Sequence, residues 1–181
     1  CSVDYEERIF SSMAHFLHGC ISDQAELELQ TLTVLTLHNL LPCLERHSVV
    51  QSMFSCLKLM VQRQQASVEM MAVMLRNITS YASIHFSIIE QGVITFLKNV
   101  LSLQPTNPRV LTDVAQAVAN LISSPDIFTS LLSQPLLPLL KDITDAKDTA
   151  SARLVALSVA QFTMHTDTAE MVSQSAGLGL F

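Results

Sequence analysis

The stretch that decides the fold is Val114–Ser123, Val-Ala-Gln-Ala-Val-Ala-Asn-Leu-Ile-Ser, which has the apolar spacing of a helix and ends in an Asn-Leu pair. Three other stretches end in a similar way: Leu37–Leu41, Leu75–Thr79 and Val159–Thr163. The polar residues of the four endings lie 38, 43 and 41 residues apart, at Asn39, Asn77, Asn120 and Gln161. A helix ending that recurs with a period of about 40 residues predicts a helical solenoid.

The composition agrees with an all-α chain. Hydrophobic residues make up 49% and charged residues only 14% of the 181 residues, which excludes a disordered chain. With 4 Gly, 2 Tyr and no Trp, an all-β sandwich or barrel is also disfavoured. We therefore expect an all-α fold with a single extended core.

The charge pattern narrows the class of partner. The net charge is −6, and the 10 Lys and Arg residues are scattered rather than clustered. Without a basic run to neutralise phosphates, we expect neither a nucleic-acid partner nor an anionic membrane surface. No apolar run approaches the roughly 18 residues that a membrane span needs, so we expect no membrane insertion.

The cysteines point to a reducing compartment. None of the 4 cysteines belongs to a C-x-x-C pair, and a long apolar helical chain needs no disulfide framework. The first residues do not form a signal peptide. We expect a cytoplasmic protein, with nuclear or cytoskeletal association as alternatives. Because the chain begins at Cys1 rather than Met, we expect it to be a piece of something longer.

The apolar periodicity predicts a unit of a short, a medium and a long helix. Gly92, Pro135 and Gly177 mark equivalent junctions between short and medium helices, and Asp145 or Asp148 caps a long helix. From residue 67 onward we expect helices over residues 67–80, 84–90, 93–103, 110–122, about eight residues from 126, 136–143 and 149–164. The chain then divides, as one domain of about four repeats, into units 1–42, 43–81, 82–124, 125–165 and the start of another at 166–181.

At this point the residues resemble the armadillo repeat. The line Ile89–Leu97, with its Gly92, and the ending Val114–Ser123 are similar to that family's helix junction and third-helix ending. The resemblance is good over residues 67–181 and loose over 1–65. It implies a right-handed α-α superhelix of the armadillo or HEAT type.

The resemblance also implies a binding surface. In the family, third helices line the concave face, and their Asn side chains hydrogen-bond the backbone of an extended partner peptide, since an amide both donates and accepts. One and two turns before the Asn positions, the same helix face continues. The groove residues implied in this chain are Asn39, Asn77, Asn120, Gln161, Leu35, Val73, Gln116, Leu157, Glu69 and Arg153.

Two features limit the ligand that this groove would take. Nuclear-import members of the family carry Trp one turn before the Asn, and this chain has no Trp, so a basic nuclear localisation signal is not expected. The candidate face carries only Arg76 and Arg153 as cations, so a strongly acidic ligand is not indicated. The alternative is structural: an Asn at a helix end satisfies backbone groups, and Val73 packs against a neighbouring repeat.

Nothing in the sequence indicates catalysis. His15, His18 and Cys20 lie close together but lack a fourth zinc ligand, and His38, His47, His85 and His165 are isolated. There is no G-x-S-x-G elbow, and the glycines are too few for a phosphate cradle. We expect no metal or cofactor and a non-catalytic scaffold that binds an extended peptide or a helix. The alternatives are a structural spacer in a larger solenoid and a substrate-recruiting module of a larger enzyme.

Overall fold

A computed structural model describes residues 67–164 together with Arg8, Ser12, His15, Phe54, Leu57 and Lys58. This part of the chain contains helices and no strand, which confirms the all-α prediction for the residues described. The elements are α4 (Val68–Ile78), η2 (Ala82–Ile84), α5 (His85–Glu90), α6 (Val93–Leu103), α7 (Pro108–Ile122), η3 (Pro125–Ile127), α8 (Phe128–Leu132), α9 (Leu136–Asp145) and α10 (Thr149–Thr163).

The same order of elements occurs twice. A short piece made of a 3₁₀ turn and a brief α-helix is followed by a medium helix and then by a helix of 15 residues. The two medium helices, α6 and α9, begin 43 residues apart. Units 1–42 and 166–181, and nearly all of 43–66, lie outside the described residues.

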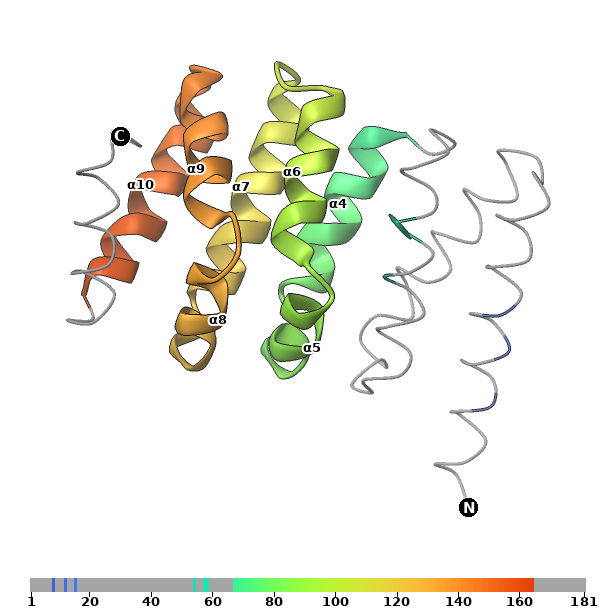
Figure 1. Cartoon of the computed structure of the whole chain (residues 1–181). Coiled ribbons are helices and arrows are strands. Elements are labelled where there is room, and N and C mark those ends of the chain that lie inside the picture. Colours follow the sequence, from blue (N-terminus) through green and yellow to red (C-terminus); the bar gives the residue numbers. More distant parts are fainter. Residues whose placement is uncertain are drawn as a thin grey trace.

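The helices form two layers, as Figure 1 shows. The long helices α4, α7 and α10 lie side by side in one layer, with α7 in the middle. The medium helices α6 and α9 form the other layer, and the short helices α5 and α8 lie at one end of it. The face of the long helices that points away from α6 and α9 is therefore not covered by any described element.

Helix α7 forms because its apolar residues recur at helical spacing and pack against α4 and α10 on its two sides and against α6 and α9. Val114 and Val118 are among the fully buried positions, and Ala115 and Ala117 are small enough to let adjacent helices approach closely. Burying one Val, Leu or Ile side chain stabilises the fold by about 1.5–3 kcal/mol. The apolar residues that α7 buries are Val110, Leu111, Val114, Ala115, Ala117, Val118, Leu121 and Ile122.

Polar side chains fix where the long helices begin. The Asn107 Oδ1 accepts a hydrogen bond from the Arg109 backbone N–H at 3.1 Å, so α7 begins at Pro108, two residues before the position predicted. At α10 the cap is Asp148, one of the two predicted candidates, whose Oδ2 accepts from the Ser151 N–H at 2.8 Å.

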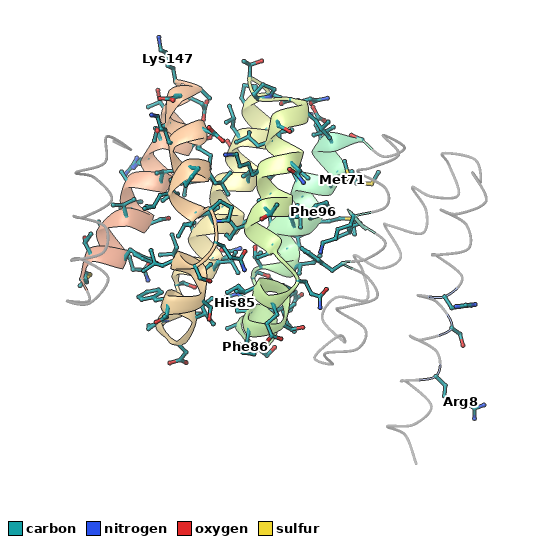
Figure 2. All side chains as sticks on the ribbon, in the orientation of Figure 1. Arg8, Met71, His85, Phe86, Phe96 and Lys147 are labelled. Atoms are coloured by element: carbon teal, nitrogen blue, oxygen red, sulfur yellow. The ribbon has the colours of Figure 1, made fainter. Side chains whose placement is uncertain are left out.

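Backbone geometry explains two of the helix junctions. Gly92 has φ +77°, a left-handed conformation that glycine adopts without steric penalty, and it joins α5 to α6. Lys147, which follows α9, has φ 59° although it carries a side chain. Figure 2 shows Lys147 at the opposite end of the helices from His85 and Phe86.

Contacts between distant parts of the chain have a regular span. Within the part of the chain that the structure describes, the hydrogen bond between His85 and Thr79 crosses a unit boundary between residues 6 positions apart, and the other side-chain hydrogen bonds between units join residues that are 33 to 45 positions apart. That separation is about one repeat. Each unit therefore contacts the unit before it or after it.

Candidate functional site

The predicted groove residues that the structure describes lie at equivalent places on the three long helices. Leu35 and Asn39 lie outside the described residues. The others follow each other at steps of four, which places them on one face of each helix. They are Glu69, Val73 and Asn77 on α4, Gln116 and Asn120 on α7, and Arg153, Leu157 and Gln161 on α10.

Their exposure increases across the layer from α4 to α10. The residues on α4 and α7 are half-buried, whereas those on α10 are exposed. Leu157 is 60% exposed. The equivalent apolar residue on α4, Val73, is half-buried rather than enclosed in the core. The structure therefore brings these eight residues together on one accessible face, which we call the long-helix face.

An ion pair joins α4 to α7 beside this face. The Arg76 Nη1 donates to the Asp113 Oδ1 at 2.6 Å, and the two side chains are 39% and 10% exposed. Burial raises the pKa of the Asp113 carboxyl above its usual range, and the charge of Arg76 opposes that shift. The Arg76 Nε also donates to the Asn77 Oδ1 at 3.3 Å, so the guanidinium connects the ion pair to the face.

Asn120 uses its amide inside the protein. Its Nδ2 donates to the Arg76 carbonyl at 3.0 Å and to the Thr79 Oγ1 at 3.3 Å. Its Oδ1 accepts from the Gln116 Nε2 at 3.0 Å. These bonds correspond to the structural alternative for Asn120, because they fasten the end of α7 to the end of α4. One lone pair of the Oδ1 remains available to a backbone N–H of a partner.

Glu69 anchors the other end of the same pair of helices. Its Oε1 accepts from the Asn107 Nδ2 at 2.9 Å, and its Oε2 lies 3.9 Å from the Arg109 Nη1. The Arg109 side chain is 82% exposed, so this ion pair contributes little to stability. Glu69 therefore takes part in helix packing through Asn107, and its charge is partly compensated.

The α10 side of the face is different. Within the part of the chain that the structure describes, the side chains of Arg153, Leu157 and Gln161 make no hydrogen bond or ion pair. The contact between α7 and α10 is largely apolar, with a weak 3.5 Å contact between the Thr112 and Ser151 hydroxyls. The α10 residues thus retain all their polar groups for another molecule.

Two polar residues inside the packing were not singled out by sequence reasoning. Asp113 and His85 are both buried, and each makes close polar contacts with another helix or turn. A signal for both existed in the repeat itself. The equivalent positions in the next unit hold the apolar residues Leu154 and Phe128, so a polar side chain in register with them requires a buried partner.

Two further observations on the described residues concern metal binding and membrane spans. No three His, Cys, Asp or Glu side chains are grouped to hold a metal ion in the described part of the chain, where His15 is the described member of the His15, His18 and Cys20 set. Among the described helices, none by itself has the length and apolarity of a membrane span, and one pair, Ala82–Glu90 with Val93–Leu103, meets those criteria only across an 81° bend.

Comparison with known proteins gave no relative. Protein-family models, curated proteins and solved structures were each compared with the chain, and none matches it. The function of this chain therefore has to be inferred from the geometry of its own residues.

Proposed function

We propose that this chain is part of an armadillo-like solenoid and acts as a non-catalytic scaffold that binds a protein segment along the long-helix face. The solenoid part of the proposal is supported by the repeated order of helices and by the span of the contacts between units. Solenoid repeats contact only their neighbours, and no side-chain hydrogen bond between units among the described residues spans more than 45 positions.

The observation that carries the binding proposal is the accessibility of equivalent residues on three adjacent helices. Here amides occupy the same position on each long helix: Asn77, Asn120 and Gln161. Amides at regular spacing suit the repeating backbone of an extended peptide.

The chemistry of the face favours a segment of mixed character. Val73 and Leu157 provide apolar contact on either side of Gln116. Glu69 and Arg153 carry opposite charges and lie on the two outer helices. The face has neither the aromatic residues that hold a basic signal nor a cluster of cations for an acidic one. We therefore propose an extended segment with alternating apolar and polar side chains as the partner.

One observation favours the alternative that this segment is a structural spacer. The amide of Asn120 already makes three hydrogen bonds within the protein. Replacing it would leave the Arg76 carbonyl and Gln116 with fewer partners, so an Asn120→Ala variant would lose stability as well as any binding role. A binding test needs residues that do not hold the fold together.

Leu157 and Gln161 meet that requirement. We expect the purified chain to select peptides from a displayed random library, and the Leu157→Ser, Gln161→Ala double variant to bind the selected peptides at least about tenfold more weakly, a loss of about 1.4 kcal/mol. Titration calorimetry measures the affinities. The melting temperature should stay close to that of the wild type, because both side chains are exposed.

The matched control carries two changes on the other layer. Thr95 and Asn99 are exposed on α6, so a Thr95→Ala, Asn99→Ala variant should bind the peptides as the wild type does. An equal loss of affinity in both double variants, or no peptide selected by the wild type, would contradict binding at the long-helix face and support the spacer alternative.

A further inference from the structure

His85 is enclosed at the junction between two units. Its side chain is 2% exposed, and it begins α5 directly after the turn that follows α4. The Nε2 lies 2.6 Å from the Thr79 carbonyl oxygen, and the Nδ1 lies 2.7 Å from the Ser124 Oγ. One imidazole therefore joins the end of α4 to the end of α7. Figure 2 places His85 at the end of the helices opposite Lys147.

The two hydrogen bonds define the protonation state of the ring. A carbonyl oxygen only accepts, so the Nε2 must carry a proton. In the neutral ring the Nδ1 then accepts a hydrogen bond from the Ser124 hydroxyl. Protonation of the Nδ1 reverses that bond, because the Ser124 hydroxyl would have to turn its proton elsewhere and become the acceptor.

Among the residues that the structure describes, none pairs its charge with a protonated His85 ring. Burial lowers the pKa of His85 below its ordinary value, and the hydrogen bond to the Thr79 carbonyl opposes that shift in part. No described carboxylate contributes to its pKa. The titratable groups on the elements around it, none of which forms a hydrogen bond or ion pair with it, are Glu69, Arg76, Tyr81, Glu90, Lys98, Arg109, Asp113 and Asp126.

Thr79 connects this histidine to the long-helix face. Its carbonyl accepts from His85, and its hydroxyl accepts from the Asn120 Nδ2. The same hydroxyl donates to the Arg76 carbonyl at 2.9 Å. A change at His85 is therefore passed through one residue to Asn120 and to the Arg76 backbone.

We propose that His85 is a pH-sensitive latch, which holds the ends of α4 and α7 together while its ring is neutral and releases them when the ring is protonated. The released state has an open turn at Thr79–Ile84 and a repositioned Asn120 side chain. The latch is a property of the free chain and does not depend on the proposed binding function.

The test is hydrogen exchange of backbone amides with NMR detection, corrected for the intrinsic effect of pH, between pH 7.5 and 5.0. The reporters are the amides of Ser80, Tyr81 and Ile84, which are hydrogen-bonded within the turn. Their protection should fall about tenfold for each pH unit by which the folded pKa of His85 lies below the pKa of the unfolded chain. The side-chain amide signal of Asn120 should shift with the same midpoint as the His85 ring.

The location of the amides that lose protection distinguishes local opening at His85 from unfolding of the whole chain in acid. The amides of Leu97 and Val100, in the interior of α6, should keep their protection across the same range. A parallel loss of protection in α6 and in the turn would overturn the proposal. So would a His85 ring that titrates at or above about 6.5, or a turn whose protection is independent of pH.

Variants identify the titrating group. Phe128 occupies the equivalent buried position in the next unit, so a His85→Phe variant should fit and should show less than a twofold change in protection. A His85→Gln variant retains a donor for the Thr79 carbonyl and serves the same purpose if His85→Phe does not fold. The control is His15→Gln, a change at an exposed histidine, which should keep the full pH response. A persistent response in both His85 variants would overturn the latch.

Discussion

Asp113 is a carboxylate on a helix face whose neighbours Val110, Leu111 and Val114 are buried aliphatic residues. It is tolerated there because the Arg76 guanidinium, from the adjacent helix, supplies both a charge and a hydrogen bond. A buried carboxylate without such a partner is strongly unfavourable. Removing one partner of such a pair therefore costs more stability than the intact pair contributes.

Removing Arg76 alone should destabilise the protein more than removing both Arg76 and Asp113. We expect Arg76→Met to lower the free energy of unfolding by about 1–3 kcal/mol, nearer the lower value because Arg76 is partly exposed. Adding Asp113→Leu should restore most of the lost free energy of unfolding, because the equivalent position in the next unit is also a leucine, Leu154. Urea unfolding of the two single variants and the double variant measures the coupling. Additive losses in the double variant would show that the pair does not compensate as described.

The pH dependence of the Arg76→Met loss has a definite sign. A carboxyl whose folded pKa is raised contributes stability below its unfolded pKa and loses it as the pH rises through the folded pKa. The loss caused by Arg76→Met should accordingly be smaller near pH 4 than at pH 7.

Substitutions at Gly92 and Lys147 test how much a left-handed backbone conformation destabilises a residue that carries a side chain. A Cβ at Gly92 would meet no atom within 4 Å, so Gly92→Ala should be penalised by its φ of +77° alone. We expect a loss of about 1–2 kcal/mol, measured by urea unfolding. Lys147→Gly relieves the same type of strain at φ 59° and should change stability by less than about 1 kcal/mol, in the favourable direction. An unchanged Gly92→Ala variant would contradict the strain argument.

At the scale of elements, side-chain caps fix where α7 and α10 begin, whereas α4 has no side-chain cap hydrogen bond. Helices α7 and α10 both have 15 residues and both begin with a side-chain cap, from Asn107 and Asp148. The medium helices α6 and α9 have no side-chain cap hydrogen bond and begin instead at Gly92 and Pro135. A cap satisfies backbone donors of the first turn and prevents the helix from starting earlier.

The Asp148 cap should depend on pH. Hydrogen bonds from the Ser151 hydroxyl and backbone N–H hold the pKa of Asp148 below its usual range. Its stabilising effect is therefore complete above its unfolded pKa and is lost as the pH falls through the folded pKa. Asp148→Ala should lower the melting temperature by a few degrees at pH 7, and Asp148→Asn by less. Thermal unfolding followed by circular dichroism should show no difference between Asp148→Ala and the wild type near pH 2; a difference that persists there would contradict the cap's role.

At the scale of the whole molecule, one unit is held by the next through repeated kinds of contact. Gln134, at the start of α9, donates to the Ile89 carbonyl and accepts from the Ile94 N–H of the preceding unit. At the preceding junction the direction is reversed: Lys58, in the earlier unit, donates to the backbone carbonyl of Gln91, the residue equivalent to Gln134. Both junctions are therefore joined by polar contacts at equivalent residues, although different groups make them.

The sequence by itself determined the secondary structure of the described part. Apolar periodicity, Pro and Gly placed its helices close to their observed bounds, because helix formation depends on residues within a few turns of one another. The sequence also predicted which residues share a side of each long helix, since residues four apart lie on the same side of a helix.

Only the tertiary structure decided what the polar side chains of that face do. The sequence allows two roles for Asn120: its amide binds a partner, or it holds two helices together. The packing of α4 against α7 decides between them, because it places the Arg76 carbonyl and the Thr79 hydroxyl within hydrogen-bonding distance of the Asn120 amide. The same holds for Asp113 and for His85, whose partner Ser124 is 39 residues away. Hydrogen bonds require atoms to meet within a fraction of an ångström, and a repeat period specifies which helices are neighbours but not that distance.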